Sequence, residues 1–330
     1  NQVFLYSIRP EAAGKKLQVD SFPAGDRKKI SFDVATDEPG KTFKVQLRDK
    51  FSVEKTEYKK PSKQLVISDI EGNFGAFRKL LLAAKVIDEQ YNWTFGDGHL
   101  LLIGDFVDRG DQVTEVLWLI YALEEKARAA GGYVHYVLGN HEIMVMSGDH
   151  RYVNPKYNEN AAMIGIHLMT LYGADTEIGR WLRTKNVVER VGNMLYTHGG
   201  ISRKVNAMDI GLSKINELAR PFYADTTYMY PDAYTDTIYQ EYGPFWYRGY
   251  YVGAETATAV QVLDSTFGKF RANKIVTGHT LIRDTISVWY DGRLYNVDTP
   301  HSKGKSEALL IEGNNYYRLK PDGTKIPLAN

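Results

Sequence analysis

Apolar and polar residues alternate in short segments over the first 58 residues of the chain. The alternating segments are residues 3–8, 16–19, 29–34 and 43–47. Turn-forming residues such as Pro39 and Gly40 separate them. An alternation of period two that is punctuated by turns is typical of short antiparallel strands. We therefore predict a small all-β unit of unknown role at residues 1–58, with a lysine-rich linker over residues 55–63.

From residue 64 onward the pattern changes to short apolar runs, each followed by a polar loop. The predicted strands are residues 65–67, 100–103, 133–138, 194–197, 274–276, 286–289 and 309–311. Helical spacing predicts helices over residues 74–86 and 113–130, and a mostly helical section over residues 156–270. A succession of strand, loop and helix indicates a mixed α/β sheet, which we assign to a second domain at residues 59–330.

The composition excludes several classes of protein. Lys plus Arg is 41 and Asp plus Glu is 40, and this balance argues against a nucleic-acid binder. Cysteine is absent, which excludes disulfides, iron–sulfur clusters and thiol nucleophiles. No apolar run reaches the roughly 18 residues of a transmembrane helix. The first residue is Asn1 rather than Met, and with the β unit and the lack of cysteine this favours an exported bacterial protein, periplasmic or secreted, with the cytoplasm as the alternative.

Five of the apolar runs end in loops that are rich in possible metal ligands. The side chains concerned are Asp69, Glu71, Asp105, Asp108, Asn140, His141, His198 and His279. Ligands bind at the carboxyl ends of strands in open α/β sheets, so we expect these side chains to meet in one crevice. Four carboxylates placed together repel one another unless cations neutralise them. Oxygen and imidazole ligands without a thiolate suit Mn, Fe, Zn or Mg.

This set of ligands is large enough for two ions with one carboxylate bridging them. A pair of ions about 3.5–4 Å apart activates an oxygen nucleophile for in-line displacement at phosphorus. Each motif alone also has a structural explanation, since a single Asp can cap a helix and a single His can be a hydrogen-bonded core residue. Five motifs in this order favour the metal site.

At these loops the sequence resembles the calcineurin-like metallophosphoesterases, and within them the phosphoprotein-phosphatase branch. The matching motifs are GDFVDRG at residues 104–110 and GNHE at residues 139–142. Residues 139–153 are similar to the Shewanella-like phosphatases, as are PFWYRG at residues 244–249 and NVDT at residues 296–299. The resemblance covers residues 64 to 312. It implies a four-layer α/β/β/α sandwich, with two sheets between layers of helices.

The resemblance also implies a role for each site residue. The implied metal ligands are Asp69 on the first ion, Asp105 between the ions, and Asn140, His198 and His279 on the second ion. The implied catalytic groups are His141 as proton donor to the leaving oxygen, Asp108 as its orienting carboxylate, and Arg109 and Arg248 as phosphate-binding residues. We further expect Glu142 to support a neighbouring ligand. Arg151 is a third candidate for binding phosphate, and the alternative is a structural salt bridge.

One position departs from the family motif, which reads Asp-x-His-Gly where this chain has Asp69, Ile70, Glu71 and Gly72. We expect Glu71 to coordinate the first ion as a harder, anionic donor, and the alternative is a weak or empty first site. This donor favours Mn, Mg or Fe over Zn. The expected cofactors are therefore two divalent or trivalent ions, with Mn or Fe favoured.

We expect phosphomonoester hydrolysis by in-line attack of a hydroxide held by the two ions, with a phosphorylated protein or a small phosphoester as substrate. Residues 222–251 hold nine tyrosines, which can stack on phosphotyrosine or simply pack against one another. A protein tyrosine or serine/threonine phosphatase is the main hypothesis. The alternatives are a hydrolase of nucleotides, dinucleoside polyphosphates or sugar phosphates, a catalytically weakened phosphate-binding protein, and an adhesion or interaction role for residues 1–58.

Overall fold

Two six-stranded sheets lie face to face in the centre of the computed structural model, which describes residues 2–12 and 14–328. The first sheet has the strand order β16–β15–β14–β6–β7–β8, in which β6, β7 and β8 are parallel and the others antiparallel. Its strands are β6 (Lys63–Ile67), β7 (His99–Ile103), β8 (Tyr133–Val137), β14 (Ala308–Glu312), β15 (Asn315–Leu319) and β16 (Lys325–Pro327).

The second sheet has the strand order β12–β13–β11–β10–β9–β5. Strands β10, β11 and β13 are parallel to one another, β9 runs antiparallel to β10 and parallel to β5, and β12 runs antiparallel to β13. Its strands are β5 (Glu57–Tyr58), β9 (Val188–Val191), β10 (Met194–Thr197), β11 (Lys274–Thr277), β12 (Ser287–Trp289) and β13 (Leu294–Asn296).

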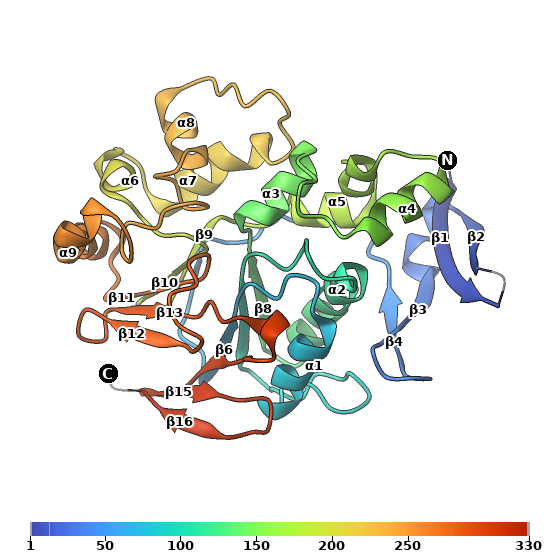
Figure 1. Cartoon of the computed structure of the whole chain (residues 1–330), viewed down its shortest axis with the longest axis horizontal. Coiled ribbons are helices and arrows are strands. Elements are labelled where there is room, and N and C mark those ends of the chain that lie inside the picture. Colours follow the sequence, from blue (N-terminus) through green and yellow to red (C-terminus); the bar gives the residue numbers. More distant parts are fainter. Residues whose placement is uncertain (1, 13, 329–330) are drawn as a thin grey trace.

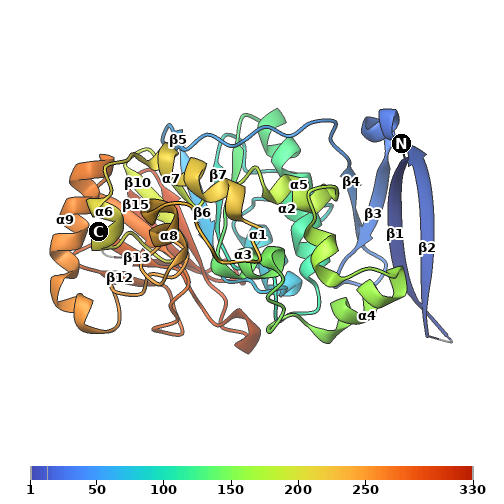
Figure 2. The same cartoon turned by 90° about the horizontal axis from the view of Figure 1, so that it is seen from above.

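Helices cover the outer faces of both sheets (Figures 1 and 2). The α-helices are α1 (Phe74–Ala83), α2 (Val113–Ala129), α3 (Asn140–Ser147), α4 (Pro155–Ile164), α5 (Glu177–Leu182), α6 (Arg203–Ala207), α7 (Leu212–Ala219), α8 (Ala233–Tyr239) and α9 (Ala259–Phe270). Short 3-10 helices are η1 (Ala24–Lys29), η2 (Leu168–Tyr172), η3 (Arg220–Phe222), η4 (Ala254–Thr258) and η5 (His301–Lys303). None of the helices within the described residues is both long and apolar enough to span a membrane.

The central strands are apolar on both faces because both faces are buried. In β6, Leu65 and Ile67 belong to the core under the helices, whereas Val66 belongs to the core between the two sheets. Tyr196 of β10 and Val276 of β11 meet Val66 in that second core from the opposite sheet. Two separate cores, one of them between the sheets, confirm the predicted four-layer sandwich.

Two hairpins at one end of the molecule confirm the predicted N-terminal strands (Figure 2). They are β1 (Gln2–Glu11) with β2 (Gly14–Pro23), and β3 (Ser31–Ala35) with β4 (Thr42–Gln46). The predicted linker differs, because it contains β5, which pairs with β9 and extends the second sheet. The division of the chain at residue 58 stays a prediction.

Candidate metal centre

The predicted site residues lie where the strands of both sheets end. Asp69 follows β6, Asp105 and Asp108 follow β7, and α3 begins with Asn140 and His141 directly after the loop from β8. His198 and His279 follow β10 and β11 of the other sheet. Ligand atoms of Asp105, His198 and His279 all lie within 4.8 Å of one another, and all three residues are buried. The fold therefore brings together side chains that are far apart in sequence.

The hydrogen bonds of His198 fix which of its nitrogens faces the centre. Its Nδ1 lies 2.8 Å from the carbonyl oxygen of Ile103, which can only accept, so Nδ1 carries the hydrogen. Its Nε2 lies 3.0 Å from Asn140 Oδ1 and 3.0 Å from Asp105 Oδ2. Two oxygen acceptors and a ring nitrogen thus converge, and a metal ion at this point would be held by all three.

The charges around His198 also favour a cation at this position. Burial lowers the pKa of His198, but the carboxylates of Asp105 and Asp69 raise it overall to about 10. A positive charge among these groups is therefore strongly favoured, and a metal ion supplies it without a proton.

His279 faces the centre with Nδ1, whereas His198 faces it with Nε2. Its Nε2 lies 3.1 Å from the carbonyl oxygen of Trp246, so Nε2 carries the hydrogen and Nδ1 is free to bind a metal. The backbone N–H of His279 donates to Asp69 Oδ2 at 3.1 Å, and this hydrogen bond links the loop after β6 to the loop after β11. The motif at residues 244–249 thus contacts His279, one of the predicted ligands, through Trp246 and Arg248.

Three carboxylates of the centre are buried, namely those of Asp69, Asp105 and Asp298. Burial raises the pKa of Asp69 to about 6, the nearby charge of Asp105 adds to this, and His198 opposes it. Asp298 is also buried, and burial together with the charge of Asp69 raises its pKa well above the ordinary value. Carboxylates in this environment fit a site for cations.

Asp298 was not among the predicted site residues. It follows β13, which has only three residues and was not predicted as a strand. The signal in the sequence was the similarity of residues 296–299 to the Shewanella-like group, to which no role was attached.

His141 and Asp108 form a buried pair. His141 Nδ1 lies 2.6 Å from Asp108 Oδ2, and His141 Nε2 lies 3.8 Å from Asp105 Oδ2. Burial lowers the pKa of His141, but Asp105 and Asp108 raise it above the ordinary value overall. The ring therefore favours its charged form and directs Nε2 toward the metal ligands.

Glu142 anchors the loops rather than facing the centre. Its fully buried carboxylate accepts hydrogen bonds from the backbone N–H groups of Asp105, Phe106 and Gly139, at 2.9, 2.8 and 2.7 Å. It also accepts one from the Tyr136 hydroxyl at 2.9 Å. The expectation that Glu142 supports a ligand agrees with this geometry, since it holds Asp105 by its backbone.

Glu71 and the two predicted phosphate-binding arginines lie at the rim. The Glu71 carboxylate forms an ion pair with the exposed Arg109, and within the described residues the compact group of ligands does not include it. Coordination by Glu71 stays a prediction.

Arg248 donates from Nη1 to the carbonyl oxygen of His279 at 2.6 Å. Arg151 is held by two short hydrogen bonds to Asp149, at 2.8 and 2.7 Å.

The backbone of the centre is strained in a systematic way. In the centre, the residues with φ between 48° and 68° are Asp69, Glu71, Asp105, Asp108, Arg109 and His279, and six other non-glycine residues elsewhere in the described chain share this range. Such angles are uncommon for residues other than glycine and gather at functional sites. At Gly139 a Cβ atom would overlap Asp105 Oδ1, so only glycine allows this close approach.

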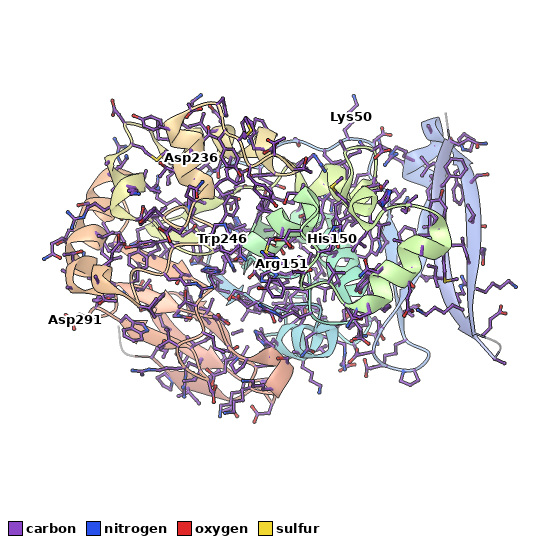
Figure 3. The ribbon with its side chains drawn as sticks, turned by 45° about the horizontal axis from the view of Figure 1, so that its top comes forward. Lys50, His150, Arg151, Asp236, Trp246 and Asp291 are labelled. Carbon is purple, nitrogen blue, oxygen red and sulfur yellow. The ribbon has the colours of Figure 1, made fainter. Side chains whose placement is uncertain are left out.

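A cavity of about 970 Å³ adjoins the centre through Trp246 and Arg248. Its aromatic residues are Tyr228, Tyr230, Tyr239, Tyr242, Trp246 and Tyr247, which belong to the predicted tyrosine-rich segment. The opposite wall is α3, through Ile143, Met144 and Ser147. Figure 3 shows Trp246 and Arg151 in the middle of this face of the molecule.

Comparisons with known proteins agree with this geometry. The family model described as calcineurin-like phosphoesterase matches residues 62–283. The chain is 29% identical to Shewanella-like protein phosphatase 1 of Plasmodium berghei, over 72% of this chain and 68% of that protein. It is 28% identical to Shewanella-like protein phosphatase 2 of Arabidopsis thaliana, over 50% of this chain and about half (52%) of that protein. The solved structure of a cold-active protein tyrosine phosphatase from a psychrophilic Shewanella superposes with a TM-score of 0.85 at 33% identity, covering 99% of both chains.

Proposed function

The chain belongs to the calcineurin-like phosphoesterase family, and we propose that it is a metal-dependent phosphomonoesterase that acts on phosphorylated proteins. The observation that carries this proposal is the convergence of Asp105, His198 and His279, with Asn140 and Asp69 bonded to them. The similarity to proteins named as protein phosphatases supports a protein substrate.

The ligands proposed for two ions are Asp69, Asp105, Asn140, His198 and His279, with Glu71 as a further donor to the first ion. When bound, the ions supply the charge that activates water and polarises the phosphoryl oxygens. Buried carboxylates and ring nitrogens with free lone pairs suit such ions. The harder Glu71 donor favours Mn or Fe within the proposal.

His141 is the proposed proton donor. Asp108 holds the Nδ1 side of the ring, so the Nε2 hydrogen is directed toward the position where the leaving oxygen departs. The raised pKa of His141 keeps that hydrogen in place until it is needed.

Arg248 and Arg109 are the proposed phosphate-binding residues. A guanidinium offers forked donors that match phosphate oxygens, and the bond from Arg248 to the His279 carbonyl fixes one of these forks beside the centre. The aromatic wall of the adjoining cavity supports a phenolic leaving group, and hence phosphotyrosine, over phosphoserine.

The test is a panel of phosphoesters assayed after the protein has been stripped of metal and reloaded with Mn, Fe, Zn or Mg. We expect phosphate release from a phosphotyrosine peptide only after reloading, with slower release from a phosphoserine peptide, a dinucleoside tetraphosphate and a sugar phosphate. Metal-independent hydrolysis, or a strong preference for the dinucleotide, contradicts the proposal.

The bridging role of Asp105 has its own test. We expect Asp105→Asn to bind neither ion, because Asp105 is the ligand proposed to be shared by both. Metal content measured by atomic emission decides it, and a variant that keeps two ions per chain refutes the role.

A further inference from the structure

The cavity beside the metal centre has an arrangement of charges that the proposed chemistry does not use. Its charged residues are Asp149, Arg151, Glu241, Arg248 and Glu255. Asp149 and Arg151 neutralise each other, and Arg248 is bonded to the His279 carbonyl on the side of the centre. Within the described residues, Glu241 and Glu255 form no ion pair, so two carboxylates remain for a ligand.

The buried Tyr247 positions one of these carboxylates. Its side chain is 1% exposed, and burial together with a hydrogen bond to Glu255 raises the pKa of Tyr247 above the ordinary value. The hydroxyl and a Glu255 carboxylate oxygen both lie 2.5 Å from the position that a Cβ at Gly249 would take, so glycine is what allows the two groups to meet. Glu255 is thereby held at the wall of the cavity, and its other lone pairs remain available to a ligand.

The aromatic residues define the rest of this space. Tyr230 and Tyr239 are stacked with ring centroids 4.5 Å apart, and Trp246 meets the His279 ring edge-on at 5.8 Å. Figure 1 shows the loop before α8 arching above α3, and Tyr228 of this loop lies 3.3 Å from Ser147 of α3 by their hydroxyl oxygens. The cavity therefore combines aromatic faces with two carboxylates. Aromatic faces and carboxylates together bind alkylammonium and guanidinium groups.

We propose that this cavity is a peptide subsite that binds a lysine or arginine side chain flanking the phosphorylated residue of the substrate. The inference rests on the proposed function. Phosphate is drawn to the arginine and metal side of the site, whereas the cationic side chain is drawn to Glu255 and Glu241. A cavity that carries both signs of charge selects a substrate that carries both signs close together.

The test compares phosphotyrosine peptides that differ only by an arginine, placed in turn at each neighbouring position, or by alanine there. In the parent protein we expect KM to be about fivefold lower for the best arginine peptide, as for one partly exposed ion pair, with kcat similar. In Glu255→Gln the ratio of the two KM values is expected to fall below about twofold. Glu217→Gln is the matched control, because Glu217 is an exposed glutamate on α7 that lies outside the cavity.

A binding measurement separates this inference from the proposed function. Fluorescent peptides with a non-hydrolysable phosphonate in place of phosphate are titrated with each protein, and anisotropy gives Kd without turnover. A preference for arginine that Glu255→Gln abolishes and Glu217→Gln retains supports the subsite, whether or not hydrolysis is seen. Equal Kd values for the arginine and alanine peptides overturn it, as does a preference that survives in Glu255→Gln. Loss of aryl phosphate hydrolysis in the parent protein, by contrast, counts only against the proposed function.

Discussion

The proposed role of His141 is to give a proton and not to bind a metal. Its Nδ1 is held by Asp108 at 2.6 Å, which leaves Nε2 as the working atom. We expect His141→Asn to reduce turnover by roughly 10²-fold or more for esters with poor leaving groups, because asparagine cannot supply the proton. For an aryl phosphate with a good leaving group the loss should be smaller.

The measurement for His141→Asn is kcat across a series of aryl phosphates of graded leaving-group pKa, together with the metal content. The slope of rate against leaving-group pKa should steepen while the metal content is unchanged. A rate equal to that of the parent protein removes His141 from the acid role.

Glu142 contributes by positioning, through the backbone of the residues that it holds. Glu142→Gln keeps the shape of the side chain but replaces one acceptor oxygen by a donor NH₂ group. This group faces backbone N–H donors and cannot accept hydrogen bonds from them. We expect a loss of about 2–3 kcal/mol in the free energy of unfolding, because a buried charge-assisted network is broken. We also expect metal affinity to fall by about 10–100-fold.

Urea unfolding and a metal titration check the Glu142 prediction, with Glu217→Gln as the surface control. A variant with normal stability and normal metal affinity contradicts it. Loss of metal affinity at unchanged stability still places Glu142 in a positioning role.

Individual site residues were predicted best from the sequence where a motif surrounds them. Asp69, Asp105, Asn140, His198 and His279 were predicted to meet, and they lie together. The orientation of Glu71 toward Arg109 was not predictable, because it depends on which rim charges lie within reach of the carboxylate. Asp298 was missed because its short strand carries too weak a pattern.

Among the elements, the uniformly apolar strands were the easiest to predict. Strand β10 occupies the predicted residues, and α2 ends one residue before its prediction. Strand β9 was missed because Glu189 and Arg190 stand in its middle and hide the pattern. Glu189 is nevertheless buried, since His135 Nδ1 lies 2.6 Å from its carboxylate and Asn186 donates to it at 2.8 Å. Burial of paired polar groups is a tertiary effect that hydrophobic spacing does not record.

Strand β4 belongs to the main core although it lies in the N-terminal unit. Phe43 is 2% exposed and its ring is stacked 6.1 Å from that of Phe74 in α1. We expect Phe43→Ala to lower the free energy of unfolding by about 3–5 kcal/mol, because it leaves a cavity under α1.

The matched control for Phe43→Ala is Phe4→Ala in β1, since Phe4 is 51% exposed. Its effect should stay within about 0.5 kcal/mol. Urea denaturation followed by tryptophan fluorescence measures both variants, and equal effects show that β4 does not stabilise the core.

For the molecule as a whole, the N-terminal residues are joined to the phosphoesterase fold by buried charges. Lys185 is fully buried and bonds to Glu54 at 2.9 Å and to Glu124 at 2.6 Å. Arg48 bonds to the other oxygen of Glu124 at 2.6 Å. Glu54 and Arg48 come from residues 1–58, whereas Lys185 and Glu124 come from the fold that the family model matches. The predicted division at residue 58 therefore cuts through a single network.

Two truncations test this network. Removal of residues 1–58 takes away β5 and leaves Lys185 and Glu124 without two of their partners, and breaking one buried ion pair alone costs about 3–5 kcal/mol. We expect that protein to be insoluble or largely unfolded at 25 °C. Removal of residues 1–23 deletes only the first hairpin, whose ion pair across to the fold, Lys15 with Glu159, is exposed. We expect it to keep aryl phosphate activity and a Tm within a few degrees of the full chain. If the longer truncation is folded and active by circular dichroism and phosphate release, residues 1–58 are an independent domain; if the shorter one unfolds, the first hairpin contributes stability that its exposed contacts do not explain.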